Sequence, residues 1–264
     1  MMIRYKFATL ILFIFSSFGV AQSSTGEAKG CVEYQSNEVS GRRILFFNET
    51  ESLFVQSSTK LGAGERESGA KIEDGGIKMT VNVKDEDGNQ YYRNFEEMSL
   101  TIRHAKASLP AYTYKDDWLT QDWAIKNKTR EIGGMQVKKA VTEFRGNTFE
   151  VWFAPEVNLP YGPWKLFGLP GLIVEARDQK TGRMDYQLQS LHIPCPVAWP
   201  LETPTAAETK TLREHVDYRD NYSDHIHQHL ISRLPPAAAA RLSPMRSNAK
   251  SPRENNLEKI YAWE

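Results

Sequence analysis

Short apolar runs separated by turn residues fill the larger part of this 264-residue chain. Across residues 77–84 apolar and polar residues alternate, the period of two that a strand with one solvated face shows. Runs at 44–47 and 53–55 flank a polar loop of hairpin length, and 171–176 is followed by 184–193 across a short turn. Sequential strands joined by such turns pair antiparallel. The pattern therefore predicts a meander of roughly eight to ten strands.

The periodicity changes after Cys195. Between about residues 205 and 233, apolar residues recur at helical spacing with charged residues between them, which predicts an amphipathic helix. Those residues are Leu212, Val216, Ile226 and Leu230. Strands followed by a helix are an α+β order, here mainly β. We expect a curved antiparallel meander sheet, partly closed like a barrel, with the C-terminal amphipathic helix packed on it.

The chain begins with a segment typical of export signals. Arg4 and Lys6 precede an apolar run at 7–18, and small residues follow at 19–21. The run is shorter than the roughly 20 residues that a spanning helix needs, so we expect no transmembrane anchor after cleavage. This gives a signal peptide at 1–21 and a protein exported to the periplasm or the extracellular space. The further expected divisions are a β domain at 22–200, a helical appendage at 201–242 and a polar tail at 243–264.

Charge and motifs exclude several classes of function. Lys and Arg number 33, as do Asp and Glu, so no global field favours nucleic acid. No nucleophile elbow, phosphate-binding loop, dinucleotide fingerprint or zinc-protease motif is present, and no catalytic residue is assigned. Carboxylate pairs such as Asp116-Asp117 sit in polar turns, where acids are usually solvated. We predict no cofactor, and a recognisable enzyme is not indicated.

Cys31 and Cys195 are the two cysteines of the chain. An oxidising compartment permits a disulfide between them, which in the chain-entropy model contributes about 4 to 5 kcal/mol. Two unrelated buried thiols are the alternative.

A histidine-rich stretch offers a candidate metal site. His225 and His229 have the i, i+4 spacing with which two imidazoles on one helix face can chelate a divalent ion, and His215 lies nearby. A solvated polar helix face explains the same residues without a metal.

Aromatic residues and prolines crowd the segment 152–178, WFAPEVNLPYGPWKLFGLPGLIVEARD. Pro170-Gly171 suits the centre of a type II turn that feeds a buried strand, because Pro fixes φ and Gly accepts positive φ. The segment is either a plug packed on the sheet, which we favour, or a binding platform, with Lys165 exposed. The candidate binding residues are Trp152, Glu156, Tyr161, Trp164, Lys165 and Phe167.

The same segment resembles the GLPGLI family of exported bacterial proteins. The hexapeptide is intact, and 144–146, 152–156 and 162–165 also match the family pattern. Its residues here are Gly168, Leu169, Pro170, Gly171, Leu172 and Ile173. The resemblance implies export and a Bacteroidetes-type origin, with no established activity.

Two functions follow as hypotheses. The first is an exported, non-catalytic binding or accessory protein of the cell envelope, whose partner is an apolar ligand or an outer-membrane protein. The second is a metal-binding or metal-dependent protein that uses His225 and His229.

Overall fold

The structure is a computed structural model that describes residues 26–36, 41–57, 69–73, 76–80, 87–106, 109–232, 236, 239–240 and 253–264. The expected signal peptide at 1–21 lies outside the described residues, as do residues 243–252 of the expected polar tail.

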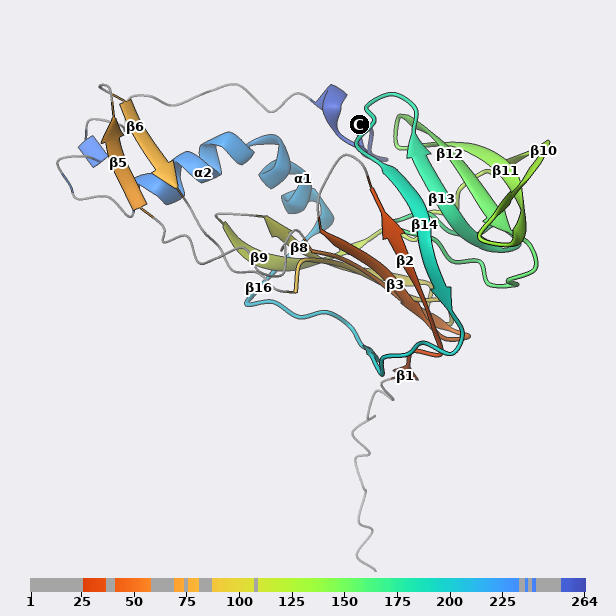
Figure 1. The fold of residues 1–264 in the computed structure, drawn as a ribbon. Coiled ribbons are helices and arrows are strands. Elements are labelled where there is room, and N and C mark those ends of the chain that lie inside the picture. The colour runs from red at the N-terminus through yellow and green to blue at the C-terminus, as the bar shows by residue number, and fades with distance from the viewer. Residues whose placement is uncertain are drawn as a thin grey trace, which may run out of the picture.

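Twelve strands form one sheet in the order β10-β11-β12-β13-β14-β2-β3-β4-β7-β8-β9-β16. Each neighbouring pair is antiparallel except β9 and β16, which are parallel. The sheet bends strongly, so that β10 to β14 and the layer from β2 to β9 lie at an angle to each other (Figure 1). The curved antiparallel meander followed by helix is therefore confirmed, and the sheet stays open between its edge strands β10 and β16.

The strands of this sheet are β2 (Gly30–Gln35), β3 (Arg42–Phe47), β4 (Glu51–Ser57), β7 (Asn89–Asn94), β8 (Ser99–Lys106), β9 (Leu109–Asp116), β10 (Ala124–Ile132), β11 (Met135–Phe144), β12 (Asn147–Ala154), β13 (Leu172–Asp178), β14 (Asp185–His192) and β16 (Glu208–Lys210). Two small two-stranded sheets accompany it: β1 (Gly26–Glu27) with β15 (Pro200–Leu201), which are distant in the sequence, and the hairpin of β5 (Gly69–Glu73) with β6 (Gly76–Thr80).

Alternating burial explains how the bent sheet holds together. Along β12, Phe149, Val151 and Phe153 are buried, and the residues between them are less so, the pattern of a strand with one face on the core. One hydrophobic cluster takes in residues of both parts of the sheet, including Leu45 of β3 and Val151 of β12. The two arms of the sheet therefore share a core and form one domain.

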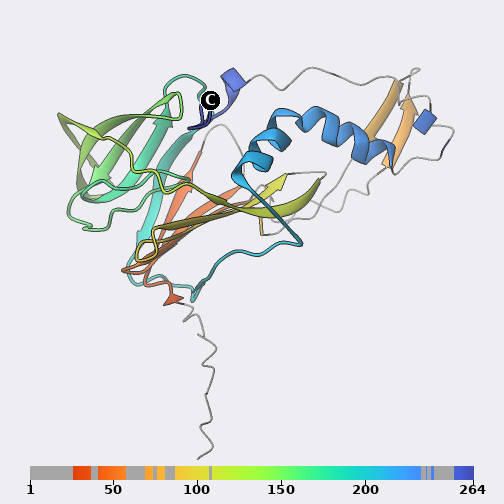
Figure 2. The same ribbon diagram turned by 180° about the vertical axis from the view of Figure 1, so that it is seen from behind.

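The predicted helix forms in two pieces, α1 (Leu212–Asp220) and α2 (Tyr222–Ile231). Thr211 and Glu214 make a capping box, in which the Thr211 hydroxyl accepts from the Glu214 N–H and the Glu214 carboxylate accepts from the Thr211 N–H. The expected start near residue 205 is wrong, because residues 208–210 form β16 against β9. Helix α1 lies over the β8–β9 end of the sheet and contacts β9 and β16, and α2 continues beyond that end (Figure 2). Neither described helix is long and apolar enough to cross a membrane.

Cys31 on β2 and Cys195, which follows β14, form a disulfide with an S–S distance of 2.10 Å. The bridge fastens the segment after β14 to the strand that β14 already pairs with. A structural disulfide is typical of chains folded in an oxidising compartment, which agrees with an exported protein.

The last described residues, 253–264, are called here the C-terminal segment. It includes a short 3-10 helix, η1 (Arg253–Asn255), and it lies against the sheet. Glu258 and Tyr261 are 6% and 3% exposed. The expectation of a polar tail is therefore wrong for this segment, because its acidic and aromatic side chains have partners in the core.

Candidate functional site

The loop between β12 and β13, residues 155–171, is folded into the protein rather than spread over it. Tyr161, Trp164 and Phe167 are buried. The Arg93 guanidinium donates to the Trp164 carbonyl, and the Trp123 indole donates to the Phe167 carbonyl at 2.8 Å. These three residues are therefore packed in the interior, as expected if the loop is a plug on the sheet.

Two other candidate binding residues lie outside the plug core. Trp152 on β12 is half-buried. The guanidinium carbon of Arg130 lies over its indole ring, 4.1 Å from the ring centroid. Glu156 is exposed. Neither is brought together with Lys165 in the site described below.

The Gly168–Ile173 hexapeptide turns differently from the predicted type II turn. The Gly171 N–H donates to the Leu169 carbonyl at 2.8 Å, a three-residue turn centred on Pro170. The Leu172 N–H donates instead to the Val157 carbonyl at 3.1 Å. Positive φ at Gly171, which was expected, is present at 150°. The turn thus starts β13, whose Leu172 and Ile173 are fully buried.

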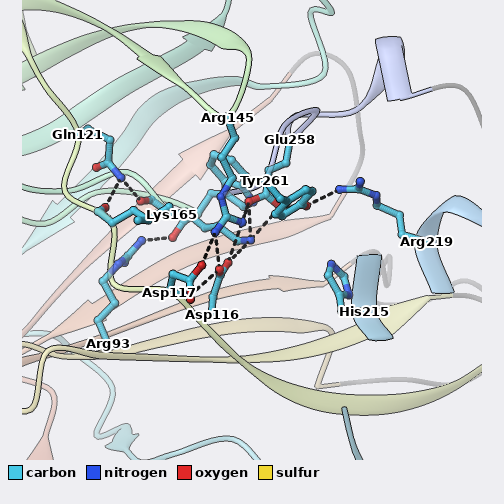
Figure 3. A network of polar contacts seen from close by, with 12 residues as sticks. Arg93, Asp116, Asp117, Gln121, Arg145, Lys165, His215, Arg219, Glu258 and Tyr261 are labelled. Carbon is cyan, nitrogen blue, oxygen red and sulfur yellow. Dashed lines mark hydrogen bonds and ion pairs between the residues drawn. The ribbon is translucent and has the colours of Figure 1, made fainter. Parts of the chain in front are cut away.

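Lys165, which the platform alternative would have placed at the surface, is 2% exposed and lies at the centre of an ion-pair network (Figure 3). Its Nζ lies 2.8 Å from both carboxylate oxygens of Glu258 and 2.5 Å from Asp116 Oδ2. Arg145, in the turn between β11 and β12, contacts the same two carboxylates. Two cations and two carboxylates therefore neutralise one another inside the protein.

The network fixes the protonation of its members. Burial alone would raise the pKa of Asp116, but the charges of Lys165 and Arg145 hold this pKa below its usual value. The interpretation of Asp116-Asp117 as a solvated pair is thus wrong for Asp116, which is buried at the end of β9, and holds for Asp117, which is exposed. The Asp116 carboxylate and the Arg145 guanidinium are therefore charged at neutral pH.

Further polar contacts attach the C-terminal segment to α1. The Tyr261 hydroxyl accepts from Arg219 at 2.7 Å, and Arg253 pairs with Asp220, a buried residue of α1. The Arg253 backbone and side chain thus lie beside the helix, while Glu258 reaches the network. The segment bridges α1 and the β12–β13 loop.

A cavity of about 470 Å³ opens between the network, the helix and the sheet. Its wall combines aromatic rings, amides and imidazoles from five strands, the loop, α1 and the C-terminal segment. The lining residues are Gln56, Asn89, Tyr91, His104, Tyr114, Trp164, Lys165, Thr181, Gly182, Arg183, Tyr186, His215, Arg219, Asn256, Leu257 and Glu258. We call this cavity the His215 pocket.

His215 is the titratable group most strongly shaped by this environment. Its ring stacks on Tyr114 with centroids 4.0 Å apart, and its Nδ1 lies 2.8 Å from the Tyr112 hydroxyl. Burial, reinforced by the charges of nearby His104 and Lys165, holds the pKa of His215 well below its usual value. The imidazole is therefore neutral at neutral pH and can both donate and accept hydrogen bonds.

The predicted metal site is not assembled among the described residues. They contain no group of three or more His, Cys, Asp or Glu side chains placed to hold a metal ion. His225 stacks on Tyr218, with ring centroids 4.3 Å apart. His225 and His229 are half-buried on α2, and neither lines the His215 pocket.

Sequence reasoning named Trp164 and Lys165 but missed their partners. Asp116, Arg145 and Glu258 come from distant parts of the chain and carry no local signature. His215 had one available signal, since it occupies the helix face that Leu212 and Val216 mark as buried. A histidine beside an apolar stripe is more often a packed side chain than a solvated one.

Comparison with known proteins gives a partial likeness. Residues 100–184 match the family model of the N-glycanase peptide, N-terminal domain. No curated protein matches the chain. Two crystal structures of PNGF-II, in different space groups, are 14% and 16% identical to it, with TM-scores of 0.46 and 0.47. They cover 72% and 71% of this chain, which spans 32% of the length of each PNGF-II chain. The matched residues run from β8 to the turn before β14 and include Asp116, Arg145 and Lys165.

Proposed function

We propose that this chain is an exported, non-catalytic binding protein of the GLPGLI type, which acts in the periplasm or outside the cell and holds an uncharged saccharide in the His215 pocket. The observation that carries the proposal is the composition of that pocket. It combines four aromatic rings with amide and imidazole groups, its Lys165 and Glu258 pair with each other, and Arg183 and Arg219 complete the polar part of the wall.

The chemistry of a sugar suits this wall. A saccharide presents apolar C–H faces, which pack on aromatic rings, and hydroxyl groups, which exchange hydrogen bonds with neutral donors and acceptors. Ligand sites generally combine an aromatic lining with a few placed polar groups. Tyr91 and Tyr114 keep their hydroxyl protons, because burial raises the pKa of each.

The family likeness supports the same class of ligand. The matched model describes the N-terminal domain of an N-glycanase, by its name a protein that acts on N-glycans. The match includes Lys165 and Tyr114 of the pocket wall. A domain of this kind in an exported protein would bind a glycan without acting on it.

Calorimetric titration of the purified protein with a panel of uncharged oligosaccharides, including an N-glycan core, tests the proposal. We expect saturable binding of at least one saccharide, and loss of at least about tenfold in affinity in Asn256→Ala, which alters the pocket wall. Asn127→Ala is the matched control, because Asn127 is exposed on β10. Absence of binding across the panel, or equal loss in both variants, would contradict the proposal.

A further inference from the structure

Glu258 occupies an unusual place in the wall of the His215 pocket. The other acidic member of the network, Asp116, belongs to the sheet, whereas Glu258 arrives on the C-terminal segment. Its carboxylate receives both Lys165 contacts at 2.8 Å and a further contact from Arg145. The Glu258 carboxylate thus accepts hydrogen bonds from a lysine and an arginine, the same contacts that a bound ligand with a carboxylate group would make.

The charges show what Glu258 does for the pocket. Lys165 and Arg145 are 2% and 5% exposed in their side chains, and Asp116 balances one of the two positive charges. Without Glu258, Asp116 would be the one buried carboxylate facing Lys165 and Arg145, with the exposed Asp117 3.9 Å from Arg145, so the positive charge beside the cavity would be poorly compensated. A buried unpaired cation strongly favours the approach of an anion.

We infer that Glu258 is a specificity-determining residue: it fills a cationic subsite of the His215 pocket as a built-in carboxylate, and so keeps the anionic groups of a ligand away from Lys165. This inference rests on the proposed function for its biological meaning. An acidic sugar or a phosphate group would meet the Glu258 carboxylate at the position where its own charge could be neutralised. A neutral saccharide meets no such repulsion.

The segment that carries Glu258 is held at several points, which keeps the carboxylate in place. Arg253 pairs with Asp220 at one end, and the Tyr261 hydroxyl accepts from Arg219. The Lys259 N–H donates to the Arg145 carbonyl at 2.8 Å, directly after Glu258. The subsite is therefore filled by a side chain on a fixed backbone.

Inorganic phosphate is the probe that tests this inference without any saccharide. We compare wild type, Glu258→Gln and the double variant Lys165→Met, Glu258→Gln at neutral pH, by calorimetric titration and by the phosphate dependence of the melting temperature. Glu258→Gln should bind phosphate at least about tenfold more tightly than wild type. The double variant should return to the wild-type value, because removing Lys165 restores the balance between Arg145 and Asp116.

Equal phosphate binding by wild type and a folded Glu258→Gln protein would overturn the inference, and so would a double variant that binds as tightly as Glu258→Gln. If Glu258→Gln does not fold, Glu258→Asp is the second test. Its carboxylate is one methylene shorter and cannot keep its contacts with both cations, so it should show intermediate phosphate affinity, and an affinity no greater than that of wild type overturns the inference. If wild type binds no saccharide of the panel, the proposed function is wrong. The phosphate measurements still test the role of Glu258 independently.

Discussion

Gly171 shows how one residue holds the β12–β13 loop in place. A Cβ at this position would lie 2.4 Å from the Ala154 carbonyl oxygen and 2.8 Å from the Pro155 Cα, both backbone atoms that cannot swing away. We expect Gly171→Ala to lower the free energy of unfolding by roughly 2 to 4 kcal/mol, from overpacking together with backbone strain. Urea denaturation followed by fluorescence measures this change.

Gly168→Ala is the control for that prediction. Gly168 also has positive φ, at 91°, but a Cβ there would meet no atom within 4 Å. Its substitution should cost only about 1 kcal/mol, the strain of the backbone alone. Equal costs at the two positions would show that the close approach to Ala154 does not matter.

His215 gives the protein a pH dependence of predictable sign. Its folded-state pKa lies well below the usual value, so between the two pKa values the unfolded chain binds more protons than the folded one. Its contribution to stability is therefore complete above the unfolded pKa of about 6.5 and is lost as pH falls below it. We expect urea midpoints to fall between pH 7.5 and pH 5.5, and to fall less in His215→Gln.

This pH range lies above the one in which Asp116 of the network titrates. Asp116 has a lowered pKa, so its contribution is lost only at much more acidic pH. His192→Gln is the matched control, because His192 is exposed on β14 and should leave the pH dependence unchanged. An unchanged slope in His215→Gln would show that this imidazole is not held neutral by the fold.

At the scale of elements, the ion-pair network joins the β12–β13 loop to the C-terminal segment. Lys165→Met should destabilise the protein by roughly 3 to 5 kcal/mol, because it leaves Glu258 and Asp116 facing Arg145 alone. Combining it with Glu258→Gln should recover part of this loss, since the remaining Arg145–Asp116 pair is balanced. A double-mutant cycle by chemical denaturation measures the coupling, and additive losses would contradict it.

The sequence could predict the strands but not the network, and the reason is physical. Strand periodicity is local, so the alternating runs of β11 and β12 are readable from neighbouring residues. Asp116 and Asp117 are adjacent in the sequence, at the end of β9, yet one is buried and the other exposed. What separates them is the position of Lys165 and Glu258, which only the folded chain brings near. The burial of Lys165 was missed for the same reason.

The helical region shows the same limit at its boundary. The spacing of the apolar residues predicted that this region is helical. It did not predict where α1 begins or that the helix is divided into α1 and α2. The β16 strand ends one residue before the Thr211 cap because residues 208–210 find hydrogen-bond partners on β9. A segment's pairing partner overrides its own helical periodicity when the two compete.

At the scale of the whole molecule, the disulfide ties the two arms of the sheet together. It joins residues 164 apart in the sequence, at the seam where β14 pairs with β2. Replacing Cys31 and Cys195 with serine should lower the free energy of unfolding by about 2 to 5 kcal/mol. Thermal melts of the variant, and of wild type with and without reductant, measure this. If reductant still lowers the melting temperature of the serine variant, the effect of reductant does not come from the Cys31–Cys195 disulfide.

The pairing of β14 with β2 also determines the order in which the strands of the sheet can pair during folding. Every other neighbouring pair from β2 to β9 and from β10 to β14 joins strands close in sequence, so each arm can assemble by local zippering. The β2 edge, by contrast, waits for a partner made roughly 150 residues later. Until β14 emerges, the newly made N-terminal arm presents an open strand edge to its surroundings. Joining the seam should therefore be the slow step of folding, and the step at which the chain is most exposed to aggregation.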